Sequence, residues 1–377
     1  MPDLRFHPEN VVNKTFDYVI CGGGTAGLTL AARLTEDSSI TVAVLEAGEH
    51  NIGESLIDVP GQFGQSFGNR KFDWSFSTTP QRHSLNKSYL WQRGKGLGGS
   101  SAMNFYAWTK PPAGDVDAIE ALENPGWNWA EYSKYTRISE TFHVAQKEQT
   151  DLYPHTHDLA FRGESGPIQV TAPHSVYTID QLFQETLIKK GLKAIKDPYG
   201  GDITGTWMAS ANLDPKSWTR SYAATAYYMP NRERQNLVVL TEATAARVLF
   251  SDAPPGEGLV ATGVEFVHGG QTVKVHSKKE VILSAGAIKS AQILELSGIG
   301  RKEILEQIGV ECNIDLRGVG QNVQDHTYLG HGDIPTWNSA STARLYDPDH
   351  LDEFSYLHHS GQSVRHNMAI WRYEKLA

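Results

Sequence analysis

The sequence predicts an α/β fold built around a parallel sheet, and three features near the N-terminus support this prediction. Phe16–Cys21 is a short apolar run with β-branched and aromatic members, typical of a buried strand. The glycine pattern Gly22-x-Gly24-x-x-Gly27 follows directly, and apolar residues at helical spacing continue from there to Leu34. A strand, a glycine turn and a helix in this order form the fingerprint of a Rossmann-like domain that binds dinucleotides.

The spacing within the fingerprint gives each glycine a physical task. Gly22 permits the tight turn, Gly24 lets the backbone approach a pyrophosphate, and Gly27 lets the helix pack closely on the strand. A second predicted strand, Thr41–Leu45, leads into Glu46, where a carboxylate can accept hydrogen bonds from the ribose of an adenosine. We therefore predict dinucleotide binding, with FAD and NAD as open alternatives. An ordinary glycine-rich βα turn is the competing interpretation, and it would leave the position of Glu46 unexplained.

Composition and charge narrow the class of protein. The chain has 377 residues, enough for two domains, and its net charge of −9 argues against nucleic acid or an anionic membrane as a partner. No apolar run is long enough to span a membrane, and the polar N-terminus shows no signal peptide. Two cysteines form no disulfide framework, and the histidines show no metal-binding spacing. We expect a cytoplasmic protein without a metal ion, with Cys21 buried at the end of the first strand.

Apolar spacing also predicts the later elements in order. The predicted helices are Asp115–Leu122, Trp129–Phe142, Ile179–Ile188, Ala223–Met229 and His350–His359. The predicted strands are Leu237–Leu240, Ala245–Phe250, Val260–Val267, Thr272–Val275 and Val281–Ser284. Residues 143–177 are polar, and we expect a loop there.

Two segments after Glu46 are suited to holding a dinucleotide. Gly48–Arg93 is rich in glycine and aromatic residues and too long for a linker, so we expect it to wrap or cover a cofactor. Arg93–Asn104 holds four glycines and two serines, whose N–H and hydroxyl donors suit a phosphate or the edge of a flavin.

The segment Arg93–Asn104 resembles the first signature of the glucose-methanol-choline (GMC) oxidoreductases, flavoenzymes that bind FAD through the same N-terminal fingerprint. Gly286–Gly300 resembles the second signature, with Ala291 where proline or serine is usual. Gly318–His326 resembles the turn that closes the FAD domain of this family. Two more stretches resemble glucose oxidase and its fungal relatives, namely Trp108–Pro111 and Gly126–Trp129.

This resemblance covers residues 16 to about 326 and implies both a domain plan and a reaction. Residues 16–160 and 220–330 are expected to form a discontinuous FAD-binding domain. Residues 161–219 and 331–377 are expected to form a partial substrate domain with an antiparallel sheet. The implied reaction is oxidation of an alcohol group with hydride transfer to flavin N5, plausible for small-molecule or secondary-metabolite biosynthesis. The implied partner is therefore a small-molecule alcohol.

The resemblance also implies which residues contact the cofactor. Thr25 and Ala26 would lie under the pyrophosphate, and Glu46 with Ala47 at the adenosine ribose. The remaining implied contacts are Gly98 and Ser100 in the second phosphate loop, Asn104, Phe105, Tyr106 and Ala107 along the isoalloxazine, and Val248 at the adenine. Some relatives bind FAD covalently through a histidine just before the asparagine. Met103 occupies that place here and has no nucleophilic nitrogen, so we expect non-covalent FAD. Core packing is the alternative role for Phe105 and Tyr106.

The catalytic base stays unassigned from the sequence. In the family it is a histidine of a late C-terminal segment, which this sequence does not reach, so we expect a C-terminally truncated member with slow turnover. His326 is expected to be structural, and at most one of His358 and His359 can point inward. The alternatives are a truncated protein that binds FAD weakly or not at all without turnover, and a non-redox homologue. Oligomeric state, substrate identity and the choice between oxidase and dehydrogenase stay open.

Overall fold

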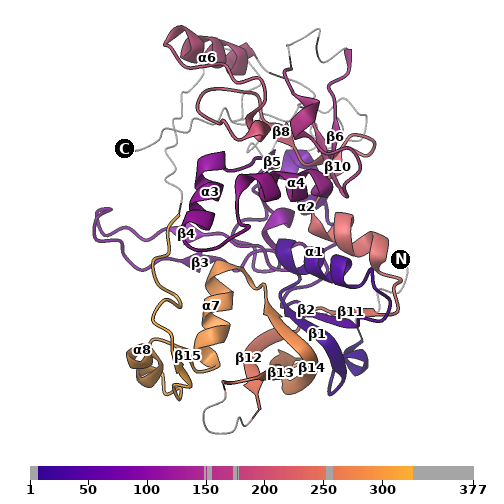
Figure 1. Cartoon of the computed structure of the whole chain (residues 1–377), viewed down its shortest axis with the longest axis vertical. Helices are drawn as coiled ribbons and strands as arrows, with labels where there is room; N and C mark the ends of the chain where they lie inside the picture. Colours follow the sequence, from indigo (N-terminus) through magenta and orange to yellow (C-terminus); the bar gives the residue numbers. More distant parts are fainter. Residues whose placement is uncertain are drawn as a thin grey trace. The chain divides into compact units, whose positions relative to one another are not determined.

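The computed structural model describes residues 7–147, 150, 155–172, 176, 178–251 and 258–325 (Figure 1). These residues form two compact units. The first unit holds residues 7–52, 66–103 and the described part of 223–325, and the second holds 53–65 and the described part of 104–222. Within the described residues, no helix combines the length and the apolar character needed to cross a bilayer.

A six-stranded mixed sheet forms the centre of the first unit, with strand order β11-β2-β1-β14-β13-β12. Its strands are β1 (Thr15–Cys21), β2 (Val42–Leu45), β11 (Leu237–Leu240), β12 (Thr244–Phe250), β13 (Ala261–His268) and β14 (Gln271–Leu283). The first four strands in that order run parallel, and the last two join antiparallel. Strands from distant parts of the chain therefore lie side by side, which confirms the discontinuous α/β fold.

Strand β14 replaces two predicted strands, Thr272–Val275 and Val281–Ser284, by one long strand. Its first half pairs antiparallel with β13, and its second half pairs parallel with β1. The polar residues between the two predicted strands stay extended because they pass from one pairing partner to the other. A register shift between Phe16 and Tyr18 accommodates this change.

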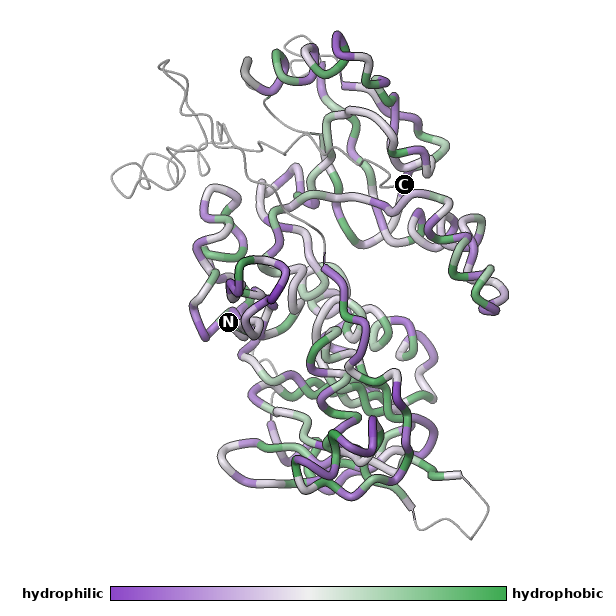
Figure 2. The backbone as a smooth tube through the Cα atoms, turned by 90° about the vertical axis from the view of Figure 1, so that its left-hand side faces the viewer, coloured by the Kyte–Doolittle hydropathy of each residue, from purple (hydrophilic) through white to green (hydrophobic). Residues whose placement is uncertain are grey.

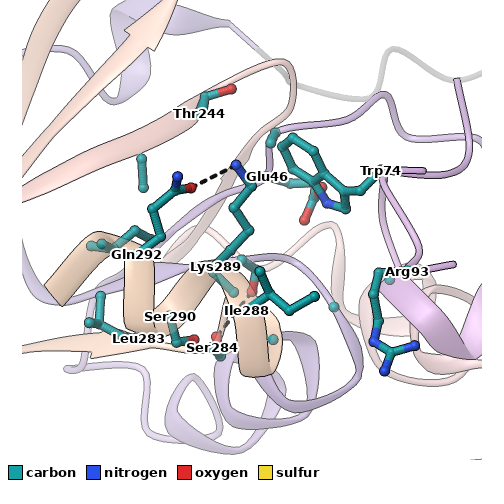
Figure 3. A pocket seen from close by; sticks show the side chains of 18 of the residues that line it. Glu46, Trp74, Arg93, Thr244, Leu283, Ser284, Ile288, Lys289, Ser290 and Gln292 are labelled. Carbon is teal, nitrogen blue, oxygen red and sulfur yellow. Dashed lines mark hydrogen bonds between the residues drawn. The ribbon is translucent and has the colours of Figure 1, made fainter. Parts of the chain in front are cut away.

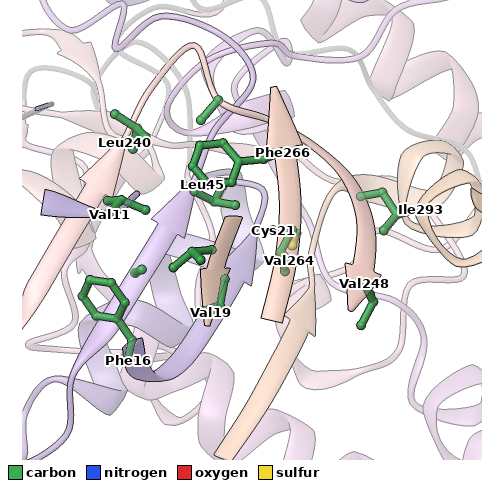
Figure 4. Packing of buried hydrophobic residues seen from close by; sticks show 13 residues of the cluster. Val11, Phe16, Val19, Cys21, Leu45, Leu240, Val248, Val264, Phe266 and Ile293 are labelled. Atoms are coloured by element: carbon green, nitrogen blue, oxygen red, sulfur yellow. The ribbon is translucent and has the colours of Figure 1, made fainter. Parts of the chain in front are cut away.

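The core of the first unit lies on this sheet (Figure 4). Its largest fully buried members include Leu45, Leu240 and Phe266, and all four residues of β2 are buried. A strand that is apolar throughout is expected for a parallel sheet covered on both faces. Cys21 is fully buried at the end of β1, as predicted, and this burial raises the pKa of its thiol to about 12.

Helices and short strands complete the first unit. They are α1 (Thr25–Leu34), α7 (Gly286–Leu296), α8 (Lys302–Gln307), the 3₁₀ turn η3 (Gly99–Ala102), the π-helical turn η6 (Ala224–Tyr228), the hairpin of β3 (Phe76–Ser77) with β4 (Leu90–Trp91), and the pair β15 (Ile299–Gly300) with β16 (Ile314–Asp315). Leu28, Ala31 and Ala32 form the buried face of α1. Ile293 brings α7 into the core cluster.

The second unit contains a four-stranded sheet of order β5-β8-β7-β6. Its strands are β5 (Ala107–Trp108), β8 (Ser210–Ala211), β7 (Ile168–Thr171) and β6 (Glu140–His143). The sheet is antiparallel as expected except for β6 and β7, which run parallel. The other elements are α2 (Ser55–Asp58), α3 (Ala113–Ala121), α4 (Trp129–Ser139), α6 (Thr178–Lys189), β9 (Leu213–Asp214) and β10 (Thr219–Arg220). Along α6, hydrophilic and hydrophobic residues follow one another, as expected for an amphipathic helix (Figure 2).

Two local predictions in this unit were wrong. The predicted helix Trp129–Phe142 ends at Ser139, because Glu140 turns extended and accepts hydrogen bonds from Trp108 Nε1 at 2.6 Å and Gly163 N at 2.9 Å. The predicted loop 143–177 contains strand β7. Residues 104–147 belong to the second compact unit, whereas the sequence placed them in the cofactor domain. The assignment of a cofactor domain and a substrate domain stays a prediction.

Candidate dinucleotide-binding site

A cavity of about 650 Å³ lies in the first unit, beside residues that directly follow β1, β2 and β14 (Figure 3). In open α/β sheets, ligands bind outside the carboxyl ends of the strands. The volume is within the usual range of small-molecule and cofactor pockets. Seven of the predicted contact residues line it, namely Gly22, Gly24, Thr25, Ala26, Glu46, Ala47 and Ser100.

The three fingerprint glycines meet different surroundings. Gly22 has φ +106°, and a Cβ there would lie 2.5 Å from the carbonyl oxygen of Ser284. A Cβ on Gly27 would lie 1.9 Å from the carbonyl oxygen of Gly22, so the helix could not pack as it does. A Cβ on Gly24 would meet nothing closer than Gly99 Cα at 3.7 Å. The fold itself therefore requires Gly22 and Gly27, whereas Gly24 leaves free space beside the cavity.

Helix α1 points its N-terminus at the cavity. Gly24 is its N-cap residue and provides no side-chain cap, and the next two residues, Thr25 and Ala26, line the cavity. The first N–H groups of a helix and its dipole together favour an anion. A phosphate group of a dinucleotide would satisfy both.

Glu46 is the buried carboxylate of the site, with 6% of its surface exposed. Its Oε2 accepts from Gly23 N at 2.8 Å, and its Oε1 accepts from Gly48 N at 2.9 Å and Gly96 N at 3.0 Å. Burial raises the pKa of Glu46, and these amide hydrogen bonds act against that rise. A carboxylate offers about four acceptor positions, and the amide of Ala47 also interacts with this one, so a ribose hydroxyl would have to share an oxygen with a backbone amide. Glu46 therefore has a structural role that the sequence did not reveal.

The second glycine-rich segment rests on the first. Gly98 N donates to the carbonyl oxygen of Gly23 at 2.8 Å, although Gly98 does not itself line the cavity. Ser100 lines the cavity, and its Oγ accepts from Gly94 N at 3.1 Å. Residues far apart in sequence thus form one continuous backbone surface beside the cavity.

The predicted isoalloxazine contacts lie in the second unit. Asn104 Oδ1 accepts from Arg220 Nη1 at 2.5 Å and from Tyr106 N at 3.2 Å. Tyr106 is buried, with the Arg220 guanidinium 3.7 Å from its ring centre, whereas Phe105 is 46% exposed and meets Phe63 edge-on at 4.9 Å. Ala107 pairs with Ala211 in the smaller sheet. Core packing thus describes Tyr106 well, and a role of all four residues along a flavin stays a prediction.

The predicted adenine contact, Val248, lies outside the lining of the cavity, and its role toward an adenine stays a prediction. Val248 packs in the core and donates its N–H to Ser297 Oγ at 2.8 Å. Residues that were not predicted as contacts also line the cavity, including Ala243–Ala246, Lys289 and Gln292, and so do Trp74 and Phe76 of the segment expected to cover a cofactor. Helix α7 follows β14, the neighbour of β1 in the sheet. With that strand order known, Lys289 and Gln292 of α7 would have been predicted to lie beside the cavity.

Other predicted features fall outside the site or outside the described residues. Within the described part of the chain, no group of three or more His, Cys, Asp or Glu side chains could hold a metal ion. His326, residues 331–377 and the predicted helix His350–His359 lie outside the described residues. No catalytic base is assigned.

Comparison with known proteins gives a consistent result. A family model described as GMC oxidoreductase matches residues 16–328. Dehydrogenase citC of Monascus ruber is 39% identical over 320 residues, which cover 84% of this chain and 50% of that protein. A solved FAD-dependent oxidoreductase from Chaetomium thermophilum has a TM-score of 0.82 at 31% identity, covering 92% of this chain and 59% of that one. A solved fungal aryl-alcohol oxidase has a TM-score of 0.77 at 27% identity, covering 93% and 59%. The chain spans about half the length of the curated relatives it matches.

Proposed function

The chain belongs to the GMC oxidoreductase family, and we propose that it binds FAD in the cavity of its first unit and serves the oxidation of an alcohol. The observation that carries this proposal is the junction of the α1 N-terminus, the open space at Gly24 and the buried Glu46 beside one cavity. These are the features that a dinucleotide's phosphates and adenosine ribose require. The names of the FAD-dependent oxidoreductase and the aryl-alcohol oxidase above support the same cofactor and substrate class.

The first turn of α1, Gly24, Ser100 and Glu46 would then each contact a different part of the cofactor. The first turn of α1 faces the diphosphate, and Gly24 leaves room for its oxygens. Ser100 presents a hydroxyl from the second loop, and Glu46, which lines the cavity, presents its carboxylate to the ribose. FAD, when bound, supplies the acceptor for the hydride that leaves the alcohol carbon.

We propose that the cofactor is held without a covalent bond. Met103, directly before the asparagine, is buried and carries a thioether, which offers no nucleophilic nitrogen for attachment. If the full chain is loaded with FAD and precipitated with acid, the yellow colour should remain in the supernatant. Yellow colour that stays in the washed pellet would contradict non-covalent binding.

The substrate proposal needs a direct test on the loaded protein. The purified chain is incubated with FAD, desalted, and mixed anaerobically with a panel of aryl and aliphatic alcohols while the flavin absorption is followed. Bleaching of the flavin bands by at least one alcohol is the expected result. Bound flavin that no alcohol reduces would contradict alcohol oxidation by this chain and would favour either a truncated protein without turnover or a non-redox member of the family. A chain that retains no flavin after desalting would contradict the proposal itself.

We also propose a cytoplasmic location and a small-molecule partner for this protein. The acidic net charge of −9 supports a small-molecule partner over nucleic acid or an anionic membrane. A cytoplasmic enzyme of small-molecule biosynthesis is consistent with that charge. Fractionation of cells that express the natural gene would test the location.

A further inference from the structure

Lys289, in the first turns of α7, extends along the wall of the cavity (Figure 3). Its Nζ donates to Gln292 Oε1 at 2.8 Å, one turn further along the same helix. The same Nζ lies 4.5 Å from the centre of the Trp74 ring and 5.6 Å from that of Phe76. Distances below about 6 Å allow a favourable cation–π interaction.

The two aromatic rings belong to the segment of residues 66–103, which contributes one side of the cavity. Trp74 and Phe76 stack with their centres 5.9 Å apart and their planes 4° from parallel. Lys95 Nζ lies 5.3 Å from the Trp74 ring, so two ammonium groups share one indole. Burial lowers the pKa of Lys289, and the charge of Lys95 lowers it further. A partly dehydrated cation interacts more strongly with an aromatic face than an exposed one.

The two parts of the 66–103 segment differ in how they contact the rest of the unit. Its later part is held by the bonds of Gly96 to Glu46 and of Gly98 to Gly23. The hairpin of β3 and β4 is instead closed on itself, for example by Trp74 N, which donates to the carbonyl oxygen of Arg93 at 2.9 Å. The contact of Lys289 with Trp74 therefore ties the base of this hairpin to α7, across the wall of the cavity.

We propose that the Lys289–Trp74 contact holds the 66–103 segment against α7 and thereby slows the release of a dinucleotide from the cavity. This inference rests on the proposed function and adds a residue that determines cofactor retention. Lys289 acts through the segment that it holds and is a positioning residue. A direct ion pair of Lys289 with a phosphate is the competing role, and the experiment below separates the two.

The first measurement is the dissociation rate of FAD from the full chain, followed by flavin fluorescence after dilution. Lys289→Met and Trp74→Leu should each speed release by about 3- to 30-fold, the range expected for loss of a cation–π contact. The double variant should release FAD no faster than the faster single variant, because both substitutions remove one contact. Lys289→Arg should stay near the parent rate, since a guanidinium also interacts with an indole. Lys302→Met, at an exposed lysine of α8, serves as the matched control.

The second measurement separates the contact from a phosphate-binding role. Calorimetric titrations of parent and Lys289→Met with ADP and with adenosine should both weaken if the segment is loosened. Weakening for ADP alone would assign Lys289 to a phosphate and overturn the proposal. Parent-like FAD release from Lys289→Met, or additive effects in the double variant, would also overturn it.

The third measurement needs no cofactor, so it stands apart from the proposed function. Amide hydrogen exchange of the hairpin around β3 and β4 should be faster in the ligand-free Lys289→Met chain than in the parent, with Lys302→Met unchanged. Equal exchange in Lys289→Met and the parent would show that the contact does not hold the hairpin. A parent chain that fails to bind FAD would refute the proposed function, while this exchange result would still decide the role of the contact.

Discussion

Glu46 shows how one side chain can combine binding with the assembly of its own site. Its carboxylate joins three backbone segments, through Gly23, Gly48 and Gly96, before any ligand is considered. A carboxylate that accepts several backbone amides acts as a local cross-link in the fold. Sequence spacing identified the residue, but it could not show that Gly96 lies beside it, because that contact depends on the tertiary fold.

Replacing Glu46 by glutamine tests both roles. A glutamine keeps the shape but presents an NH₂ group to at least one backbone N–H, which leaves a buried donor unpaired. Glu46→Gln should lower the free energy of unfolding by about 1–3 kcal/mol and also weaken FAD binding. Glu49→Gln is the control, since Glu49 is exposed and forms only a 3.7 Å surface ion pair with Lys71. Denaturant unfolding and FAD titration check both effects, and a fully stable Glu46→Gln would contradict the structural role.

The buried carboxyl of Asp58 in the second unit should make the stability of the protein depend on pH. Burial raises the pKa of this carboxyl to about 6 from the ordinary 3.8, against the opposing charge of Arg220, and its Oδ1 has no hydrogen-bond partner among the described residues. The folded state then binds the proton more tightly than the unfolded state, so Asp58 lowers stability progressively as the pH rises from about 4 to about 6.

Because ionised Asp58 lowers stability, its replacement by a neutral residue should help most at higher pH. Asp58→Asn should gain stability relative to the parent as the pH rises through this window, by about 1–2 kcal/mol after allowance for solvent screening. Denaturant unfolding of both chains at several pH values measures the difference, with Glu123→Gln as an exposed control. A stability difference that stays constant between pH 4 and 7 would show that Asp58 does not titrate this way.

Within the glycine turn and α1, Gly27 is needed for packing of the helix on the strand, whereas Gly24 borders the cavity. Gly27→Ala places a Cβ 1.9 Å from the carbonyl oxygen of Gly22, so the helix must move off the strand. We expect a loss of about 2–4 kcal/mol in the free energy of unfolding. Gly24→Ala is the matched control, because its Cβ meets ordinary contact distances and the loss of an N-cap glycine to alanine costs only about 1 kcal/mol. Thermal or denaturant unfolding of the pair checks this, and equal stability of the two variants would refute the packing argument.

Elements with strong local patterns were predictable, and those fixed by tertiary pairing were not. β1, α1, β2 and β11 follow from apolar spacing within a few residues, so their predicted bounds agree closely with the structure. β14 could not be predicted as one strand, because its polar centre stays extended only through pairing with β1 and β13. The end of α4 depends on Glu140 reaching Trp108 and Gly163, which lie elsewhere in the chain.

At the scale of the whole molecule, the sequence motifs were sufficient for the family and the α/β class, because several independent signatures agree with one architecture. Half of the residues that were predicted to contact a dinucleotide, seven of fourteen, line one cavity, since the spacing of the first motif follows the strand–turn–helix order. The sequence placed Trp74 in a segment expected to cover a cofactor and Lys289 with Gln292 in the second signature, but it did not show that these side chains meet at one cavity wall, because that depends on the tertiary fold. The motifs also left the catalytic base unassigned.

The proposed function requires that the cavity of the first unit holds FAD. Equilibrium titration of the full chain with FAD tests this requirement when Gly24→Ala is measured in parallel, because this variant should stay folded with a loss of only about 1 kcal/mol while its Cβ occupies the space beside the cavity. We expect saturable binding of FAD to the parent at a one-to-one ratio and at least tenfold weaker binding to Gly24→Ala, which corresponds to about 1.4 kcal/mol. No saturable binding to the parent, or equal affinity in the two proteins, would contradict it.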